Sequence, residues 1–92
     1  MTFAAPPATA QVTIDVARIT CDRLILFKVA LPHDMAMWLS GYYNASVRST
    51  VVDLNEFAQA AKTVKDFCQT SPQSTVMAAS ERALGIKMPR PR

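Results

Sequence analysis

The residues of this sequence that could take part in chemistry are few. It contains two cysteines, Cys21 and Cys68, and a single histidine, His33, in 92 residues. Two cysteines so far apart in the chain can be free thiols, zinc ligands, a redox pair or a disulfide. The CxxC spacing of a redox motif is absent, and a zinc site would have to recruit carboxylates besides His33. We therefore expect no metal site, while reduced thiols and a disulfide both remain open.

The other polar residues do not indicate catalysis. A nucleophile needs a base within reach, and His33 stands beside Pro32 at an exposed helix start with no serine or cysteine at a suitable spacing. Two glycines are too few to build a phosphate-binding loop. The acids pair with bases, as Asp66 does with Lys62 four residues earlier. We expect a protein that is not an enzyme and that binds no cofactor.

Four predicted helices position these residues, and little of the sequence is typical of strands. The first helix is expected at about 20–29, with Thr20 as its cap. The second begins with Pro32 and is weakened at its far end by Gly41. Residues 45–52 are expected to form a loop or one short extended piece.

The third and fourth helices have clear start and stop signals. Asp53 and Glu56 predict a capping box at the start of the third helix. Ser71 and Pro72 are expected to cap and open the fourth helix, and Gly85 to end it.

Apolar residues at helical spacing predict which face each helix buries. Cys21 shares a face with Leu24, and Cys68 ends a stripe four residues after Val64, so both cysteines are expected to face the core. On the fourth helix, Ser80 is placed to bond back to the Val76 carbonyl. The second helix carries four apolar residues at the spacing of one stripe: Met35, Trp38, Leu39 and Tyr42.

The C-terminal tail differs from the body of the chain in charge. Residues 15–84 hold all seven acids and seven of the ten lysines and arginines, so the body is formally neutral. The excess of +3 comes from Lys87, Arg90 and Arg92, in a basic, proline-rich tail over residues 86–92. Its prolines argue against a DNA-reading helix, so we expect no nucleic-acid partner.

Residues 1–14 are expected to be a flexible N-terminus. The first eleven carry no charge, and Ala8-Thr9-Ala10 is the small-x-small triplet that signal peptidase cuts. We interpret the segment as the remnant of a signal peptide, with a plain disordered N-terminus as the alternative. No apolar run approaches the roughly 18 residues of a membrane-spanning helix, so we expect no stable membrane insertion.

Four stretches in this order resemble the HdeA/HdeB family of periplasmic acid-stress chaperones. They are "ITCDRLILF", "PHDMAMWLSGYY", "VVDLNEF" and "KTVKDFCQTSPQ", and the resemblance covers about residues 15–84. It implies an all-α protein: a small single-domain bundle of about four short helices over residues 15–85, tied by a Cys21–Cys68 disulfide. It further implies a periplasmic protein that is a homodimer near neutral pH and binds acid-unfolded client proteins in strong acid. The basic tail and the Tyr42-Tyr43 pair do not map onto the family pattern.

Two sets of residues are candidates for that function. The expected client-binding and dimer surface is apolar and consists of Met35, Met37, Trp38, Leu39, Tyr42, Tyr43, Val51, Val52 and Leu54. The expected pH-responsive acids are Asp22, Asp34, Asp53, Glu56 and Asp66. The alternative function is a small extracytoplasmic helical module that binds one fixed partner or an apolar ligand through the same helix face.

Overall fold

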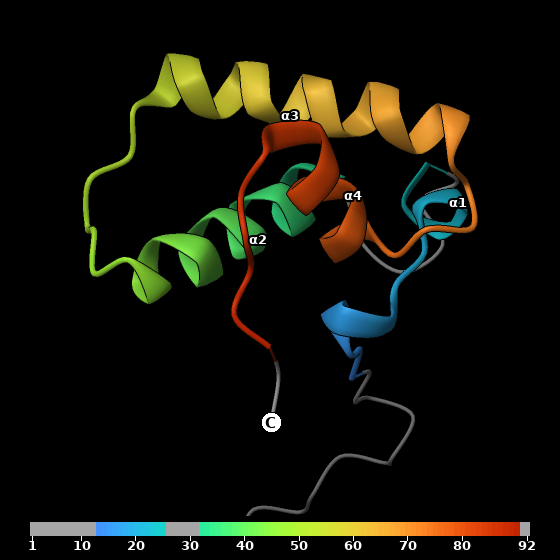
Figure 1. Ribbon diagram of the computed structural model, residues 1–92, viewed down its shortest axis with the longest axis horizontal. Coiled ribbons are helices and arrows are strands. Elements are labelled where there is room, and N and C mark those ends of the chain that lie inside the picture. Colours follow the sequence, from blue (N-terminus) through green and yellow to red (C-terminus); the bar gives the residue numbers. More distant parts are fainter. Residues whose placement is uncertain (1–12, 26–31, 91–92) are drawn as a thin grey trace, which may run out of the picture.

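The computed structural model of the protein describes residues 13–25 and 32–90 (Figure 1). Its elements, in chain order, are the 3-10 turn η2 (Val16–Arg18) and the helices α1 (Cys21–Ile25), α2 (Pro32–Ser46), α3 (Leu54–Thr70) and α4 (Val76–Leu84). Within the described ranges the only β-type pairing is an isolated bridge between Thr20 and Thr75. The predicted all-α bundle of about four short helices is confirmed.

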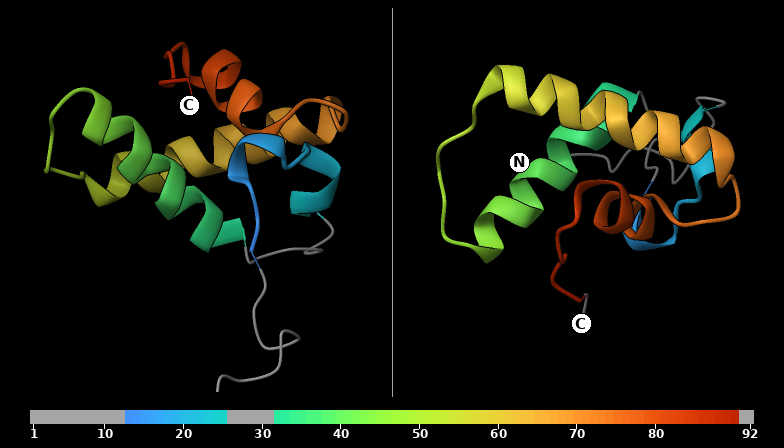
Figure 2. Two further views of the ribbon diagram at one scale, coloured as in Figure 1. Left: turned by 90° about the horizontal axis from the view of Figure 1, so that it is seen from below. Right: turned by 45° about the horizontal axis from the view of Figure 1, so that its top comes forward.

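The helices are arranged around α3. This helix packs against α4 and α1, and it contacts α2 less extensively. Residues 47–53 join α2 to α3, and the two helices move apart toward this loop in Figure 1 and in the right panel of Figure 2. The bundle is therefore open between α2 and α3 on the side of the loop.

The ends of α3 and α4 follow the predicted signals in part. The Asp53 carboxylate accepts hydrogen bonds from the N–H groups of Asn55 and Glu56 at 2.9 and 3.0 Å, so Asp53 caps α3 as predicted. Within the described residues the Glu56 carboxylate makes no return bond to Asp53, so the capping box has only its first half. Gly85 ends α4 in the left-handed conformation at φ 65°, where glycine is favoured because it has no Cβ. The Ser80 hydroxyl donates to the Val76 carbonyl at 2.9 Å, also as predicted.

The predicted start of α4 at Ser71 and Pro72 is wrong. Ser71 ends α3, and α4 begins after Thr75, whose hydroxyl accepts from the Ala78 N–H at 3.1 Å. The intervening residues form a turn whose carbonyls bind another helix: the N–H groups of Cys21 and Asp22 donate to Ser74 and Pro72 at 2.8 and 3.1 Å.

The prediction that the Thr20 side chain caps α1 is wrong, because the turn before α4 takes over this function. Because the first N–H groups of α1 are satisfied by a turn that is distant in sequence, the Thr20 hydroxyl is free to donate to the Asp22 carboxylate. The helix expected at about 20–29 is present as Cys21–Ile25, and residues 26–31 lie outside the described residues.

Helix α2 runs unbroken through Gly41 to Ser46. Gly41 is exposed, and an added Cβ would meet no atom within 4 Å, so neither packing nor an unusual backbone conformation interrupts the helix there. The connecting loop predicted over residues 45–52 is present at 47–53, because α2 extends through Ala45 and Ser46.

Cys21 and Cys68 form a disulfide and are both completely buried, with their Cα atoms 5.0 Å apart. The bond joins α1 to α3 in the centre of a core that also contains Leu24, Val64 and Val76. The predicted disulfide is thus confirmed, and no group of three potential metal ligands occurs among the residues described.

Replacing both cysteines with alanine is expected to lower the free energy of unfolding by about 4 kcal/mol, because the bond closes a loop spanning 47 positions in the unfolded chain. In a domain this small, that is a large part of the net stability. Urea unfolding followed by circular dichroism at pH 7 measures the loss. Wild-type protein treated with a reductant should match the variant, and an unchanged unfolding midpoint would contradict this role of the bond.

Candidate functional site

An apolar groove lies between α2 and α3, where the two helices move apart. It has a volume of about 890 Å³ and reaches from the 47–53 loop to the side of α4. We call it the α2–α3 groove; its principal apolar lining residues are Leu39, Tyr43, Val52, Phe57, Ala61 and Met88. Its shape and chemistry suit an apolar segment or ligand.

The mouth of the groove is formed by exposed apolar residues and by charges. Val51 and Val52, in the loop before α3, line the groove and have 77% and 41% of their surface exposed. Asp53, Glu56 and Lys65 lie along the groove on the α3 side. Apolar surface of this extent next to a polar rim is typical of a protein-binding site.

A second hollow, of about 810 Å³, lies between α2, η2 and the C-terminal segment. We call it the Trp38 hollow; its lining includes Ile14, Val16, Trp38, Tyr42, Met77 and Arg90. The rings of Trp38 and Tyr42 stack with centroids 4.9 Å apart, and Trp38 is 47% exposed. The carboxylates of Asp15 and Asp34 also border the hollow.

Helix α2 therefore presents its apolar residues in two directions. Met35 and Leu39 are buried and form the line on which the helix packs. Leu39 and Tyr43 face the α2–α3 groove, Trp38 and Tyr42 face the Trp38 hollow, and Met35 borders both. Of the four residues predicted as one stripe, Met35 and Leu39 thus form the buried line, and Trp38 and Tyr42 lie beside it toward the Trp38 hollow.

The remaining predicted surface residues are only partly brought together. Val51 and Val52 line the α2–α3 groove, whereas Met37 and Leu54 are exposed and line neither hollow. The binding role of all nine residues stays a prediction.

Residues that the sequence analysis left out of the body contribute to both hollows. Met88 is only 3% exposed and lines the α2–α3 groove together with Ile86, while Arg90 lines the Trp38 hollow. One sequence signal was available: Ile86 directly follows Gly85, and an apolar residue after such a helix end commonly packs back onto the helix.

The five predicted pH-responsive acids do not form a cluster. Asp22 lies on α1, Asp34 on α2 and the other three at or on α3, and the one bond between two of them is the cap from the Glu56 backbone N–H to the Asp53 carboxylate. Asp66 pairs with Lys62 at 3.1 Å in an exposed i, i+4 bridge, as predicted. Any response to pH through these acids is therefore distributed over the molecule.

The fold lowers the pKa of the Asp22 carboxyl. Its carboxylate accepts the Thr20 hydroxyl and the Arg23 N–H, the latter at 2.8 Å. Hydrogen bonding from Thr20, aided by Arg23, lowers the pKa of Asp22 below its ordinary value of 3.8. The charged form of Asp22 consequently stabilises the start of α1.

Comparison with known proteins agrees with this architecture. The HdeA/HdeB family model matches residues 1–78. The chain belongs to the HdeA/HdeB family. Searches of the curated proteins and of the solved structures returned no match. HdeA/HdeB proteins are periplasmic acid-stress chaperones and not enzymes, and the groove, the hollow and the disulfide are consistent with such a protein. None of the helices in the described part is long and apolar enough to cross a membrane.

Asp22→Asn should reduce the acid sensitivity of the fold. Because the folded pKa of Asp22 is depressed, its contribution to stability is present above pH 3.8 and is lost as the pH falls through the folded value. The variant should be less stable than wild type at about pH 6, and the two should converge near pH 2. Urea midpoints across this range measure the effect, with Asp66→Asn as the control for loss of an exposed carboxylate. If the urea midpoints of Asp22→Asn and of wild type change with pH in parallel, the prediction is wrong.

Proposed function

We propose that this protein is an acid-activated periplasmic holdase that binds unfolding proteins at low pH through apolar surface uncovered when a neutral-pH homodimer dissociates. The observation that carries the proposal is the open α2–α3 groove, whose lining includes the exposed residues Val51 and Val52. A holdase needs such a surface because unfolding proteins present apolar segments of many shapes. Family membership supports the same function.

A homodimer near neutral pH accounts for the apolar surface of the isolated chain. Large apolar side chains remain exposed on α2 and the following loop, among them Met37, Trp38 and Val51. A soluble monomer rarely leaves this much clustered apolar surface uncovered. The formally neutral body of residues 15–84 offers little repulsion to a second copy, so association through these residues is physically favourable.

Acid weakens this association by changing the charge of the protein. Around pH 2–3 the carboxylates are largely protonated, so residues 15–84 pass from seven acids against seven bases to about eight positive charges once His33 is included. Self-repulsion then opposes both the dimer and the compact fold. Since Asp22, Asp34, Asp53, Glu56 and Asp66 are scattered over α1, α2 and α3, many small losses act together on the dimer, and none of these five acids is a switch by itself.

The disulfide limits how far the acid form opens. Thiol–disulfide exchange requires thiolate, which is scarce in acid, so the Cys21–Cys68 bond persists there. It keeps α1 attached to α3 while the apolar faces separate. The product is a tethered chain with exposed apolar stripes, which suits capture of clients better than a fully unfolded coil does.

The size of the α2–α3 groove supports a second candidate function. At about 890 Å³ it falls within the range of small-ligand pockets, and its lining is mainly apolar. A module that binds one fixed partner or an apolar ligand would bind tightly and stoichiometrically at neutral pH. Titration calorimetry with apolar ligands at pH 7, beside light scattering of an acid-labile client at pH 3, distinguishes the two functions.

Trp38→Ala should weaken the neutral-pH dimer by about 2–3 kcal/mol, as expected when a central aromatic anchor is removed. Sedimentation equilibrium at pH 7 measures the dissociation constant. Gln59→Ala, an exposed change on α3 that lines neither hollow, is the matched control and should leave association unchanged. A wild-type protein that is strictly monomeric at high micromolar concentration would disprove the dimer.

Neutralising several acids together should move client binding to higher pH. The variant replaces Asp22, Asp34, Asp53 and Asp66 with Asn and Glu56 with Gln, and the Asn at position 53 preserves a capping side chain. Suppression of client aggregation as a function of pH is the measurement, with His33→Ala as the control that should resemble wild type. A shift of a full pH unit from His33→Ala alone, or no client binding at any pH, would contradict the distributed mechanism.

A further inference from the structure

The C-terminal segment 86–90 folds back onto the bundle and crosses α2 (Figure 1). The left-handed turn at Gly85 reverses the chain at the end of α4. Met88 then enters the core, and the Tyr42 hydroxyl of α2 donates to the Pro89 carbonyl at 2.9 Å. We call residues 86–90 the C-terminal strap.

The strap is held by one carboxylate, that of Glu81 on α4. Its Oε2 atom accepts the Met88 N–H at 2.8 Å and lies 3.6 Å from Nη2 of Arg90. The Glu81 side chain is only 17% exposed, whereas that of Arg90 is 69% exposed. The bond from the Met88 N–H to this shielded carboxylate is charge-assisted and therefore stronger than a bond between neutral groups, and the ion pair with Arg90 adds to it.

The strap also separates the two apolar hollows. Ile86 and Met88 line the α2–α3 groove, and Arg90 lines the Trp38 hollow. Met35 borders both hollows from the α2 side, so the strap and α2 together form the wall between them. Removing the strap would take Met88 out of the core that it shares with Met77 and break the bond from Tyr42 to Pro89, so it would widen access to this core.

We propose that the C-terminal strap is an acid-released cover, held at neutral pH by Glu81, that restricts access to the apolar interior. The proposal rests on the proposed holdase function and names a regulatory element of the same site. Glu81, Met88 and Arg90 all lie beyond residue 78, where the family match ends, so family membership predicts nothing about them.

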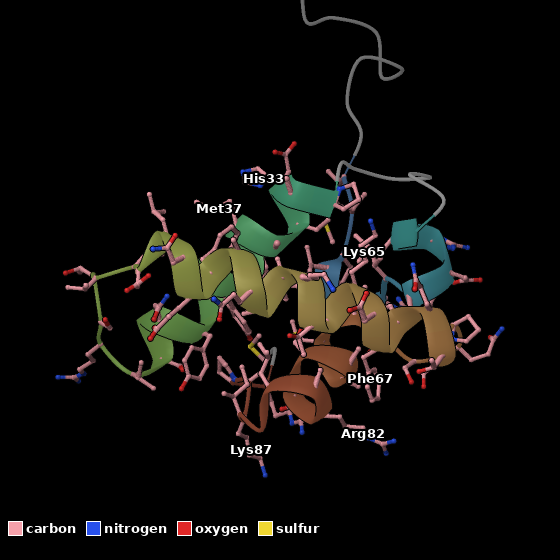
Figure 3. All side chains as sticks on the ribbon, turned by 90° about the horizontal axis from the view of Figure 1, so that it is seen from above. His33, Met37, Lys65, Phe67, Arg82 and Lys87 are labelled. Carbon is pink, nitrogen blue, oxygen red and sulfur yellow. A yellow bond between two sulfur atoms is a disulfide. The ribbon has the colours of Figure 1, made fainter. Side chains whose placement is uncertain are left out.

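The charges around the strap favour release in acid. Arg82 of α4 and Lys87 of the strap point into solvent (Figure 3). Among the described residues, the other titratable groups that border the strap or the hollow lined by Arg90 are Asp15, which caps η2, and Asp34 and Tyr42 of α2. Acid neutralises carboxylates, so the loss of the negative charges of Glu81, Asp15 and Asp34 weakens the attraction that holds Arg90 near them.

Amide hydrogen exchange of the full chain tests the strap directly, because the Met88 N–H is the group that Glu81 holds. Glu81→Gln keeps the shape of the side chain but removes its charge. At pH 7 it should lower the protection of the Met88 amide by about tenfold, as expected for loss of a charge-assisted bond. Asp66→Asn, which removes a carboxylate from an exposed pair on α3, is the control and should leave Met88 protection unchanged.

Wild-type protein provides a test that does not depend on the variant folding. As the pH is lowered, the protection factor of the Met88 amide should fall before those of core α3 amides such as Val64. Loss of Met88 and Val64 protection at the same pH would overturn the proposal, and so would equal Met88 protection in Glu81→Gln and wild type. Client holding is measured in parallel: early loss of Met88 protection without holding at any pH supports the strap and refutes the holdase function.

Discussion

The bond between Cys21 and Cys68 joins the first and third helices of a chain that is too short to bury a large core. Around it lie Leu24, Val64 and Val76, and the turn between α3 and α4 supplies the carbonyls that satisfy the first N–H groups of α1. Because α1 is short, it depends on that bond and that turn for its position. The rest of the bundle is built on this cross-link, including the placement of α4 under α3.

The cross-link leaves α2 as the less firmly held part of the bundle. Helix α2 buries Met35 and Leu39 but has apolar residues on both sides of that line, so neither side is fully covered. The groove toward α3 and the hollow at Trp38 follow from this arrangement. An apolar surface that is divided in the folded monomer and joined when the helices separate fits a protein whose function is expressed as its packing loosens.

Electrostatics gives such a molecule two kinds of response to acid. The scattered carboxylates of the body contribute small terms that add up, whereas Glu81 concentrates a backbone hydrogen bond and an ion pair on one shielded group. Under the proposed function, the first response would set the balance between the dimer, the fold and charge repulsion. The second acts on one segment, which lets access to the interior change before the helices themselves separate.

The sequence by itself determined the helical class and the buried faces of both cysteines, because these depend on the spacing of apolar residues. It also determined the cap of α3 at Asp53, the bond from the Ser80 hydroxyl to the Val76 carbonyl and the end of α4 at Gly85, because each depends on local spacing or on the backbone preference of one residue. The bond between Cys21 and Cys68 came from the family resemblance and not from the residues alone. Tertiary structure decided the start of α4, since the carbonyls at Pro72 and Ser74 were needed by α1. It also decided the division of α2 between two hollows and the burial of Met88. These depend on contacts between segments far apart in the chain, which periodicity within one helix cannot encode.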